Sequence, residues 1–287
     1  MTILDSYFKS TVEEILNHGV KTEGRTKNDR IRLLSGKVFK YPCHNYKFNV
    51  FSLRQNSIQL PISETLGFLT GATKVQELEQ IHPANKLWYQ WSDDNGNLGG
   101  VYGEAFANQY HKIVEGLKYN PTSTHHRMTT LIPDKLPLEG TSYHQNVQMG
   151  KFALWPCLHS FHFLSDGQNL YLHASQASCD FGVGGIPHNS YQIQFLLLLT
   201  AHLTGLNPTY AYHHIHDVHL YENQLDAVKE IMKNEQLVNE VTLNFKDVTM
   251  LDLDYVELHR DYGHLKNIVK VEGEVSQHDK IDVPVDS

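Results

Sequence analysis

The stretch of this sequence that decides its fold begins with Lys151-Phe-Ala-Leu-Trp-Pro-Cys157. Apolar and polar residues then alternate over residues 157–164, Asp166-Gly167 provides a turn, and the alternation resumes over residues 170–174. This pattern predicts a β-hairpin. Residues 189–206 are almost entirely apolar, which predicts a helix that is buried on all sides. We therefore expect an α+β fold around a central buried helix.

The rest of the chain extends this arrangement on both sides. Apolar residues at helical spacing predict four further helices, over residues 3–16, 57–69, 106–117 and 223–233. Strand-like runs occupy residues 31–51, 125–132, 210–221, 241–245, 255–259 and 268–271. We expect one domain with a mixed sheet over residues 1–272 and an acidic tail over residues 273–287.

Composition narrows the class of protein. The chain has 287 residues, of which 40% are hydrophobic, and this is enough for one large core. The net charge of -8 argues against binding to nucleic acid or to an anionic membrane surface. Three cysteines without a CxxC pair favour a reducing compartment, and no apolar run is long enough to span a membrane. We therefore expect a cytoplasmic protein.

Histidines cluster near the end of this core region, and they raise the question of a metal site. His213, His214, His216 and His219 lie on one predicted strand. Successive side chains of a strand point to opposite faces, so four ligands from this run would not converge on one ion. We expect no metal.

Two further motifs follow the hairpin. The first is Gln176-Ala-Ser-Cys-Asp180-Phe-Gly-Val-Gly-Gly-Ile-Pro-His-Asn189, and the second is His216-Asp-Val-His219-Leu-Tyr221. Together with Cys157, their order resembles the thymidylate synthase family, which includes the pyrimidine hydroxymethylases of phages. The resemblance implies a homodimer packed sheet against sheet. It also implies transfer of one carbon from 5,10-methylenetetrahydrofolate to C5 of a deoxyuridine nucleotide.

The resemblance assigns the chemistry to four residues. A free cysteine is more often a small buried hydrophobe, but the family's matching cysteine adds to C6 of the pyrimidine, which is the role implied for Cys157. Glu64 matches a glutamate that moves protons near C5, and Tyr102 matches the tyrosine of a Gly-Pro-Val-Tyr-Gly turn. Asn189 matches the residue that reads the base, where asparagine accompanies uracil and aspartate accompanies cytosine. In purely structural roles, Glu64 would be an exposed helix residue and Asn189 would cap a helix.

The resemblance assigns the remaining site residues by ligand. Those implied for the folate are Asp180, Trp88, Trp91, Gly185, Arg54 and His188; those for the sugar are His219 and Tyr221; those for the phosphate are Arg25, Ser178, His126 and Arg127.

The sequence also departs from the family pattern. Ala177, Thr124 and His125 stand where the family has phosphate-binding arginines, so fixed positive charge is lost. Leu158 replaces the histidine after the cysteine, and one residue is inserted between Asp180 and Asn189. His188 replaces a phenylalanine that packs on the folate.

These departures leave three functions open. Trp88 is retained, and because its counterpart shields the reaction from water it favours methylation to thymidylate, which is the leading expectation. The C-terminal residues 283–287 differ from the family's apolar end, which favours hydroxymethylation of deoxyuridylate or, less so, of deoxycytidylate. The third possibility is a catalytically silent family member that acts as a binding subunit.

Overall fold

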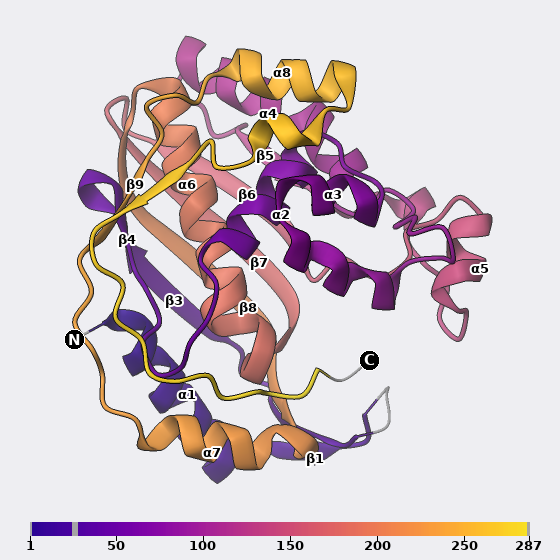
Figure 1. Ribbon diagram of the computed structural model, residues 1–287, viewed down its shortest axis with the longest axis vertical. Coiled ribbons are helices and arrows are strands. Elements are labelled where there is room, and N and C mark those ends of the chain that lie inside the picture. Colours follow the sequence, from indigo (N-terminus) through magenta and orange to yellow (C-terminus); the bar gives the residue numbers. More distant parts are fainter. Residues whose placement is uncertain (1, 25–27, 286–287) are drawn as a thin grey trace.

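The large sheet of this protein organises the molecule (Figure 1). The computed structural model describes residues 2–24 and 28–285. The sheet has the strand order β1-β2-β8-β7-β6-β5, with β3 also paired to β8. Its strands are β1 (Val20–Thr22), β2 (Arg30–Leu33), β3 (Lys37–Pro42), β5 (Arg127–Thr129), β6 (Leu158–Ser165), β7 (Asn169–Asp180) and β8 (Asn207–Tyr221). Since β7 and β8 are parallel and the other pairs are antiparallel, the sheet is mixed.

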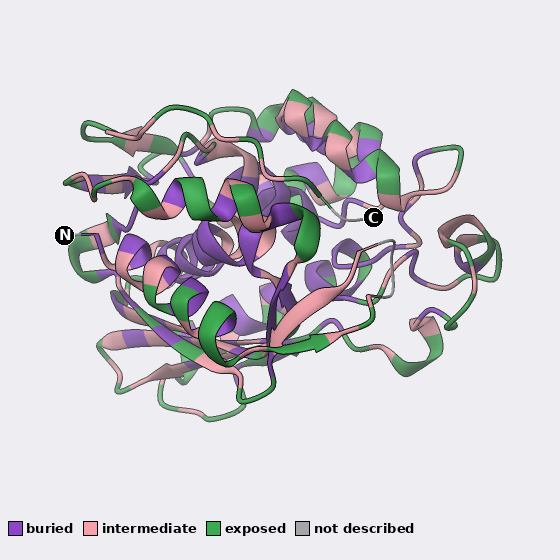
Figure 2. Cartoon of the chain, turned by 90° about the horizontal axis from the view of Figure 1, so that it is seen from below, coloured by how far each residue is buried: buried purple, intermediate pink, exposed green. Residues whose placement is uncertain are grey.

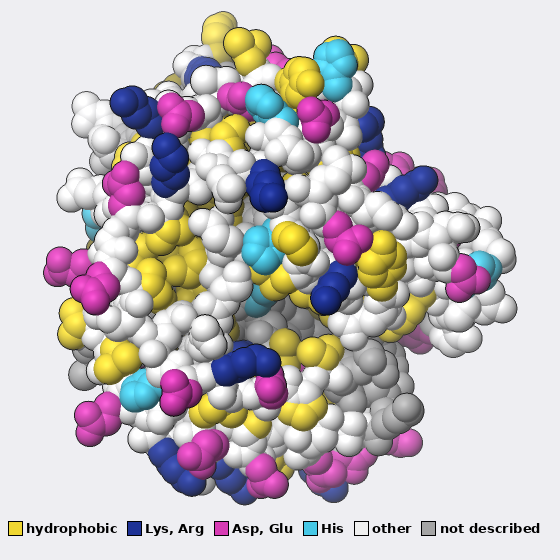
Figure 3. All heavy atoms as spheres, viewed as in Figure 1, with side chains coloured by type: hydrophobic (Ala, Val, Ile, Leu, Met, Phe, Trp, Pro, Cys, Tyr) yellow, Lys and Arg dark blue, Asp and Glu magenta, His cyan; other side chains and the backbone are white. Residues whose placement is uncertain are grey.

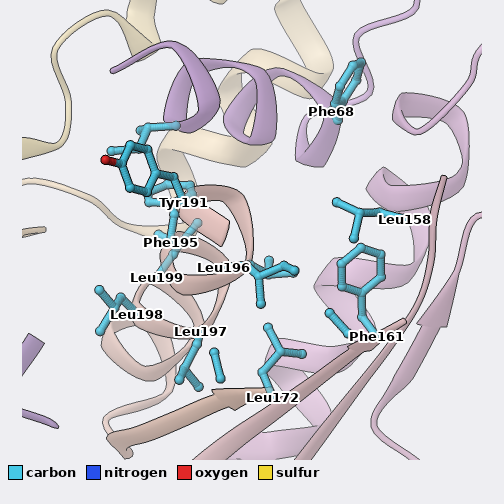
Figure 4. Close-up of a cluster of buried hydrophobic side chains, with 14 of the residues drawn as sticks. Phe68, Leu158, Phe161, Leu172, Tyr191, Phe195, Leu196, Leu197, Leu198 and Leu199 are labelled. Atoms are coloured by element: carbon cyan, nitrogen blue, oxygen red, sulfur yellow. The ribbon is translucent and has the colours of Figure 1, made fainter. Parts of the chain in front are cut away.

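The connection between the two parallel strands forms the centre of the core. It contains the helical turn Phe181–Asn189 and then α6 (Ser190–Thr204), which packs against β7 and β8. Leu196, Leu197, Leu198 and Leu199 are all buried, and they come from every side of the helix (Figure 4). Each such burial contributes about 1.5–3 kcal/mol. Gly205 ends the helix with φ 75°, a conformation that glycine adopts without strain.

Other helices cover the same side of the sheet. Leu4, Phe8, Val12 and Ile15 form the buried face of α1 (Ile3–His18), which packs on β2 and β8. The helices α2 (Gln59–Leu69) and α4 (Gly103–Tyr119) pack against α6, so buried residues gather in the middle of the molecule (Figure 2). The remaining helices are α3 (Val75–Ile81), α5 (Tyr143–Gln148), α7 (Leu225–Lys233) and α8 (Met250–His259). None of the helices in the described ranges is long and apolar enough to cross a membrane.

The predicted α+β fold with a mixed sheet is confirmed, and two of the predicted strands need correction. Residues 255–259 belong to α8, because Thr249 caps that helix through Asp252 and the buried Leu253 and Val256 lie one turn apart. The strand predicted over residues 125–132 is limited to β5. Next to it, the His126 ring contacts the Asn120 carbonyl oxygen, and the His126 carbonyl oxygen accepts from the backbone N–H of Phe163 in β6.

A small second sheet leads into the C-terminal segment. It has the order β10-β9-β4, formed by β10 (Lys270–Glu272), β9 (Val241–Asn244) and β4 (Lys47–Phe48). Residues 273–285 then run back across the molecule as an extended strap, coloured yellow in Figure 1. The His278 N–H donates to the Ser52 carbonyl oxygen at 2.9 Å, and the Pro284 carbonyl oxygen accepts from Gln224 Nε2 at 2.9 Å. These bonds hold the strap against the body of the protein.

Candidate active site

A cavity of about 330 Å³ lies between α2, α6 and the ends of β6 and β7. The face of the molecule in Figure 3 is hollowed near its middle, at this place. The apolar side of the cavity is formed by residues such as Phe68, Leu158, Phe161 and Leu196 (Figure 4). The sequence-predicted residues that line it are Glu64, Trp88, Trp91, Tyr102, Cys157, Ser178, Asp180, His188, Asn189 and Tyr221.

Cys157 and Tyr102 meet at one wall of the cavity. The backbone N–H of Cys157 donates to Tyr102 Oη at 2.9 Å. Tyr102 has φ 62°, an uncommon conformation for an aromatic residue, immediately before α4. The next residue must be Gly103, because a Cβ there would meet the Ala72 carbonyl oxygen at 1.9 Å. Burial raises the pKa of Tyr102 far above its usual value, so its hydroxyl stays protonated and can donate a hydrogen bond.

Glu64 is a buried carboxylate with three hydrogen-bond donors. It lies on the apolar helix α2, and only 2% of its side chain is exposed. Trp88 Nε1 donates to Oε1 at 2.9 Å, while His188 Nε2 and Gln192 Nε2 bond to Oε2 at 2.7 and 2.9 Å. Burying a charge without such partners would cost several kcal/mol. These contacts hold the carboxylate at the cavity wall.

The Asn189 amide is oriented by a buried chain of hydrogen bonds. Asn189 Oδ1 accepts from Gln176 Nε2 at 3.1 Å, and Asn189 Nδ2 donates to Gln192 Oε1 at 2.9 Å. Gln176 Oε1 lies 2.7 Å from His213 Nε2, and His213 Nδ1 lies 3.1 Å from Tyr41 Oη. Since a carbonyl oxygen can only accept, His213 Nε2 carries the hydrogen and Nδ1 accepts from the tyrosine. Asn189 keeps one N–H and one lone pair for a ligand.

His213 holds the far end of this chain in a neutral state. Its side chain is fully buried, and this burial lowers its pKa to about 3. A neutral imidazole has one donor and one acceptor, as its two contacts require.

Aromatic rings and a carboxylate face each other at the other side of the cavity. The rings of Trp88 and Trp91 meet edge to face at 5.3 Å. Asp180 Oδ2 accepts from Gln224 Nε2 at 2.8 Å, and burial raises the pKa of Asp180. Gln224 also donates to the Pro284 carbonyl oxygen, so the C-terminal strap is tied to this carboxylate. The indole rings and the carboxylate acceptor fit a flat heteroaromatic ring with N–H groups on its edge.

The polar end near Ser178 has a different character. Ser178 Oγ donates to Asp217 Oδ2 at 3.3 Å, Arg32 Nε donates to Oδ1 at 2.9 Å, and Arg30 Nη1 lies 3.8 Å from Oδ2. Burial alone would raise the pKa of Asp217, but its contacts with His219, at 3.5 Å, and with Arg32 outweigh burial and lower it. The two arginines therefore face a carboxylate of the same chain.

Several predicted site residues lie outside the cavity lining. Arg127 Nε donates to the Thr124 carbonyl oxygen at 3.1 Å on the edge strand β5, away from Ser178. Gly185 packs against β7, where a Cβ at this position would meet Cys179 Sγ at 2.5 Å. His126 bonds to Asn120, as described above, and His219 lies beside Asp217. Arg54 is mostly buried, and this burial lowers its pKa. Arg25 lies outside the described residues.

Sequence reasoning missed four polar residues that hold the others in place. Gln176, Gln192, Gln224 and Asp217 each hydrogen-bond to a predicted site residue. The available signal was spacing: Gln176 and Asp217 precede Ser178 and His219 by two positions, and therefore share a strand face with them. Within residues 2–24 and 28–285, no group of three or more metal-ligating side chains could hold an ion.

Comparison with known proteins gives a consistent result. Residues 6–272 match the sequence profile described as thymidylate synthase. Proteins named thymidylate synthase from three strains of Vibrio cholerae serotype O1 are each 27% identical to this chain over 264 residues. The aligned region covers 84% of this chain and 88% of each relative.

Proposed function

This chain belongs to the thymidylate synthase family, and we propose that it transfers a one-carbon unit from 5,10-methylenetetrahydrofolate to C5 of a deoxyuridine nucleotide. One observation carries the proposal: Cys157, Glu64, Tyr102 and Asn189 come from different parts of the chain and line one cavity. Together they offer a nucleophile, a carboxylate for proton transfer, a phenol donor and an amide that can read a base edge.

The proposed chemistry begins with the thiolate of Cys157, which adds to C6 of the uracil ring. The electron pair of the C5–C6 double bond then makes C5 nucleophilic, with negative charge shared by O4. The remaining N–H and lone pair of Asn189 match O4 and N3–H of uracil. Glu64 moves the proton at C5. The folate, held between the tryptophans and Asp180, supplies the one-carbon unit when bound.

The two ends of the cavity support a specific base and a site for the substrate's phosphate. Asn189 favours uracil over cytosine, because cytosine has an amine in place of O4 and no hydrogen on N3. At the phosphate end, Arg30 Nε is buried and has no hydrogen-bond partner among the residues described. A phosphate bound at this end would compete with Asp217 for Arg30 and Ser178.

The product depends on which group, hydride or water, is added to the one-carbon unit attached to C5. Hydride from the folate gives thymidylate, and water gives the 5-hydroxymethyl nucleotide. The indole of Trp88 is fixed by Glu64 and packs at 5.4 Å on Phe68, which supports a wall that excludes water. The imidazole of His188 on the same carboxylate favours water as the second candidate.

We also propose that two copies pair through the outer face of the large sheet. His173 stacks on Tyr212 at 4.5 Å and lies 3.1 Å from His214, on the face opposite α6. The neighbouring Val38 is 60% exposed. A second copy would bury these rings. Residues 123–127 of each copy would then approach the phosphate end of the other copy. Light scattering at micromolar concentration should return a dimer; a monomer would contradict this arrangement.

Product analysis tests the proposed function directly. The protein is incubated with deoxyuridylate, tetrahydrofolate and formaldehyde, and the nucleotide is examined by mass spectrometry. A gain of a methyl or hydroxymethyl group supports the proposal. Deoxyuridylate that stabilises the protein in a thermal-shift titration but is recovered unchanged would identify a binding subunit instead.

A further inference from the structure

His188 is positioned as a partner of the buried carboxylate. It directly precedes Asn189, and its Nε2 lies 2.7 Å from Glu64 Oε2. Glu64 exposes 2% of its side chain, whereas His188 exposes 25% and lines the cavity. The buried carboxylate also accepts from the Trp88 indole and the Gln192 amide, neither of which can supply or take up a proton near neutral pH. His188 is therefore the one titratable group in direct hydrogen-bond contact with Glu64 among the described residues.

The contact determines which nitrogen of the ring is available. Because the ionised carboxylate only accepts, Nε2 carries the hydrogen, and a neutral ring then has its lone pair on Nδ1. No residue in the described ranges forms a hydrogen bond with Nδ1. A carboxylate that holds one imidazole nitrogen stabilises the ring as the other nitrogen takes up a proton, which is the arrangement of a general base.

We propose that His188, oriented by Glu64, is the general base that delivers water to the one-carbon unit at C5, so that the product is a 5-hydroxymethyl nucleotide. This inference rests on the proposed function, because it needs a methylene group already transferred from the reduced folate to C5.

The step balances without an oxidant or a reductant. Water loses a proton to His188 Nδ1 while its oxygen forms a bond to the exocyclic methylene carbon. The π electron pair of the double bond between C5 and this carbon moves to form the C5–C6 double bond, while the single bond between C5 and the carbon remains. The C6–S bond breaks, and Cys157 leaves as a thiolate. The folate departs as tetrahydrofolate, whereas methylation would release it as dihydrofolate.

A purely structural role for His188 is the alternative, since it satisfies a buried carboxylate. Two variants and a matched control separate the two roles. His188→Gln keeps an N–H donor for Glu64 but has no base, and His188→Phe removes both. Gln192→Met removes a different donor from the same oxygen of Glu64 and leaves the base in place.

The measurements are the nucleotide product by mass spectrometry and the oxidation state of the released folate. We expect the wild type to form the 5-hydroxymethyl nucleotide and tetrahydrofolate. Since general base catalysis contributes about 10²–10⁴-fold, hydroxymethyl formation should fall at least about 100-fold in His188→Gln. His188→Phe should shift the remaining product towards thymidylate. Gln192→Met should lower the rate but keep the wild-type product ratio.

A second readout needs no folate. Addition of Cys157 to C6 activates C5, so incubation of deoxyuridylate in D₂O should exchange the hydrogen at C5 for deuterium. In His188→Gln this exchange should fall less than about 10-fold, because it does not involve the water-delivery step.

The outcomes distinguish this inference from the proposed function. A wild type that exchanges C5 and makes only thymidylate with dihydrofolate overturns the role of His188 and leaves the proposed function standing. Equal changes of product ratio in His188→Gln and Gln192→Met also overturn it. If the wild type neither exchanges C5 nor forms either product, the proposed function itself fails.

Discussion

The two polar ends of the cavity differ in how their hydrogen bonds are arranged. We call them the base end, at Asn189, and the phosphate end, at Ser178, after the proposed substrate. At the base end, donors point in one direction from Tyr41 through His213, Gln176, Asn189 and Gln192 to the carboxylate of Glu64. At the phosphate end, Ser178, Arg32 and Arg30 converge on Asp217. The first end is a chain of hydrogen bonds that run in one direction, and Asn189 keeps one free N–H and one free lone pair. The second is an ion cluster around Asp217, in which Arg30 Nε has no hydrogen-bond partner among the residues described.

This difference indicates which part of a substrate the cavity is arranged to recognise. An amide whose two ends are fixed presents one pattern of donor and acceptor, and so it selects among bases. A phosphate at the other end would have to compete with the carboxylate of Asp217, which already binds Arg32 and lies near Arg30. We therefore expect recognition to depend more on the base than on the phosphate, and the following experiments test that ordering.

The largest effect should come from the nucleophile at the base end. Cys157→Ser should reduce turnover at least about 10⁴-fold, because a serine hydroxyl is a far weaker nucleophile than a thiolate. Product formation from deoxyuridylate, measured by mass spectrometry, checks the loss. Cys43→Ser, at a buried thiol away from the cavity, is the control and should remain active. Turnover in Cys157→Ser close to that of the control would remove the covalent mechanism.

Asn189→Asp should change the preferred base. A protonated aspartate can donate to N3 of cytosine and accept from its amine, so preference should move from uracil to cytosine by about 100-fold. Competition between deoxyuridylate and deoxycytidylate measures the ratio, and Asn189→Ala separates loss of binding from a change of preference. An unchanged ratio in the aspartate variant would show that the base end does not read the base.

The buried end of the hydrogen-bond chain should make stability depend on pH. His213 has a folded pKa of about 3 and an unfolded value of about 6.5, so the unfolded state binds the extra proton between these values. The contribution of neutral His213 to stability is complete above about pH 6.5 and is lost as pH falls towards 3. At pH 5 the loss should be about 2 kcal/mol.

His213→Gln provides the comparison for this prediction, because glutamine offers hydrogen bonds without titrating. Denaturant unfolding of both proteins at pH 7.5 and pH 5 measures the difference. Other histidines of the sheet titrate in both proteins, so they cancel in the subtraction. Equal losses in the two proteins would mean that His213 is not held neutral.

The smallest effect should come from the phosphate end. Ala177 is exposed next to Ser178, which leaves room for a longer side chain. Ala177→Arg should tighten deoxyuridylate binding about 10-fold through a charge-assisted contact and should leave deoxyuridine binding unchanged. Ala177→Gln, similar in reach and uncharged, is the control. If calorimetric titration shows no gain, or the same gain for both ligands, the phosphate does not bind near Ser178.

The sequence predicted the elements of this fold better than the contacts inside it. The apolar run at residues 189–206 and the alternation around Asp166-Gly167 predicted α6 and the β6–β7 hairpin, since local periodicity carries that information. The same reasoning misread residues 255–259, where a short apolar run fits a helix and a strand equally well.

The contacts of His188 and His213 could not be predicted because they depend on long-range packing. His188 meets a carboxylate on α2, far away in the chain, and the geometry of the intervening turn decides which atom it reaches. His213 reaches Gln176 only because β7 and β8 are parallel, in a register that pairs Gln176 with Ile215. A motif reports that such residues exist, but their partners are set by the finished sheet.

The C-terminal strap has a consequence for how the protein is made. Val285 lines the cavity, and Pro284 is bonded to the glutamine that holds Asp180. At about 5–20 residues per second, Val285 leaves the ribosome roughly ten to forty seconds after Glu64. During that interval the nascent chain can complete the sheet and its central helix while one side of the cavity is still missing. A ribosome that stalls after β10 would therefore carry a nearly folded protein that lacks this last wall.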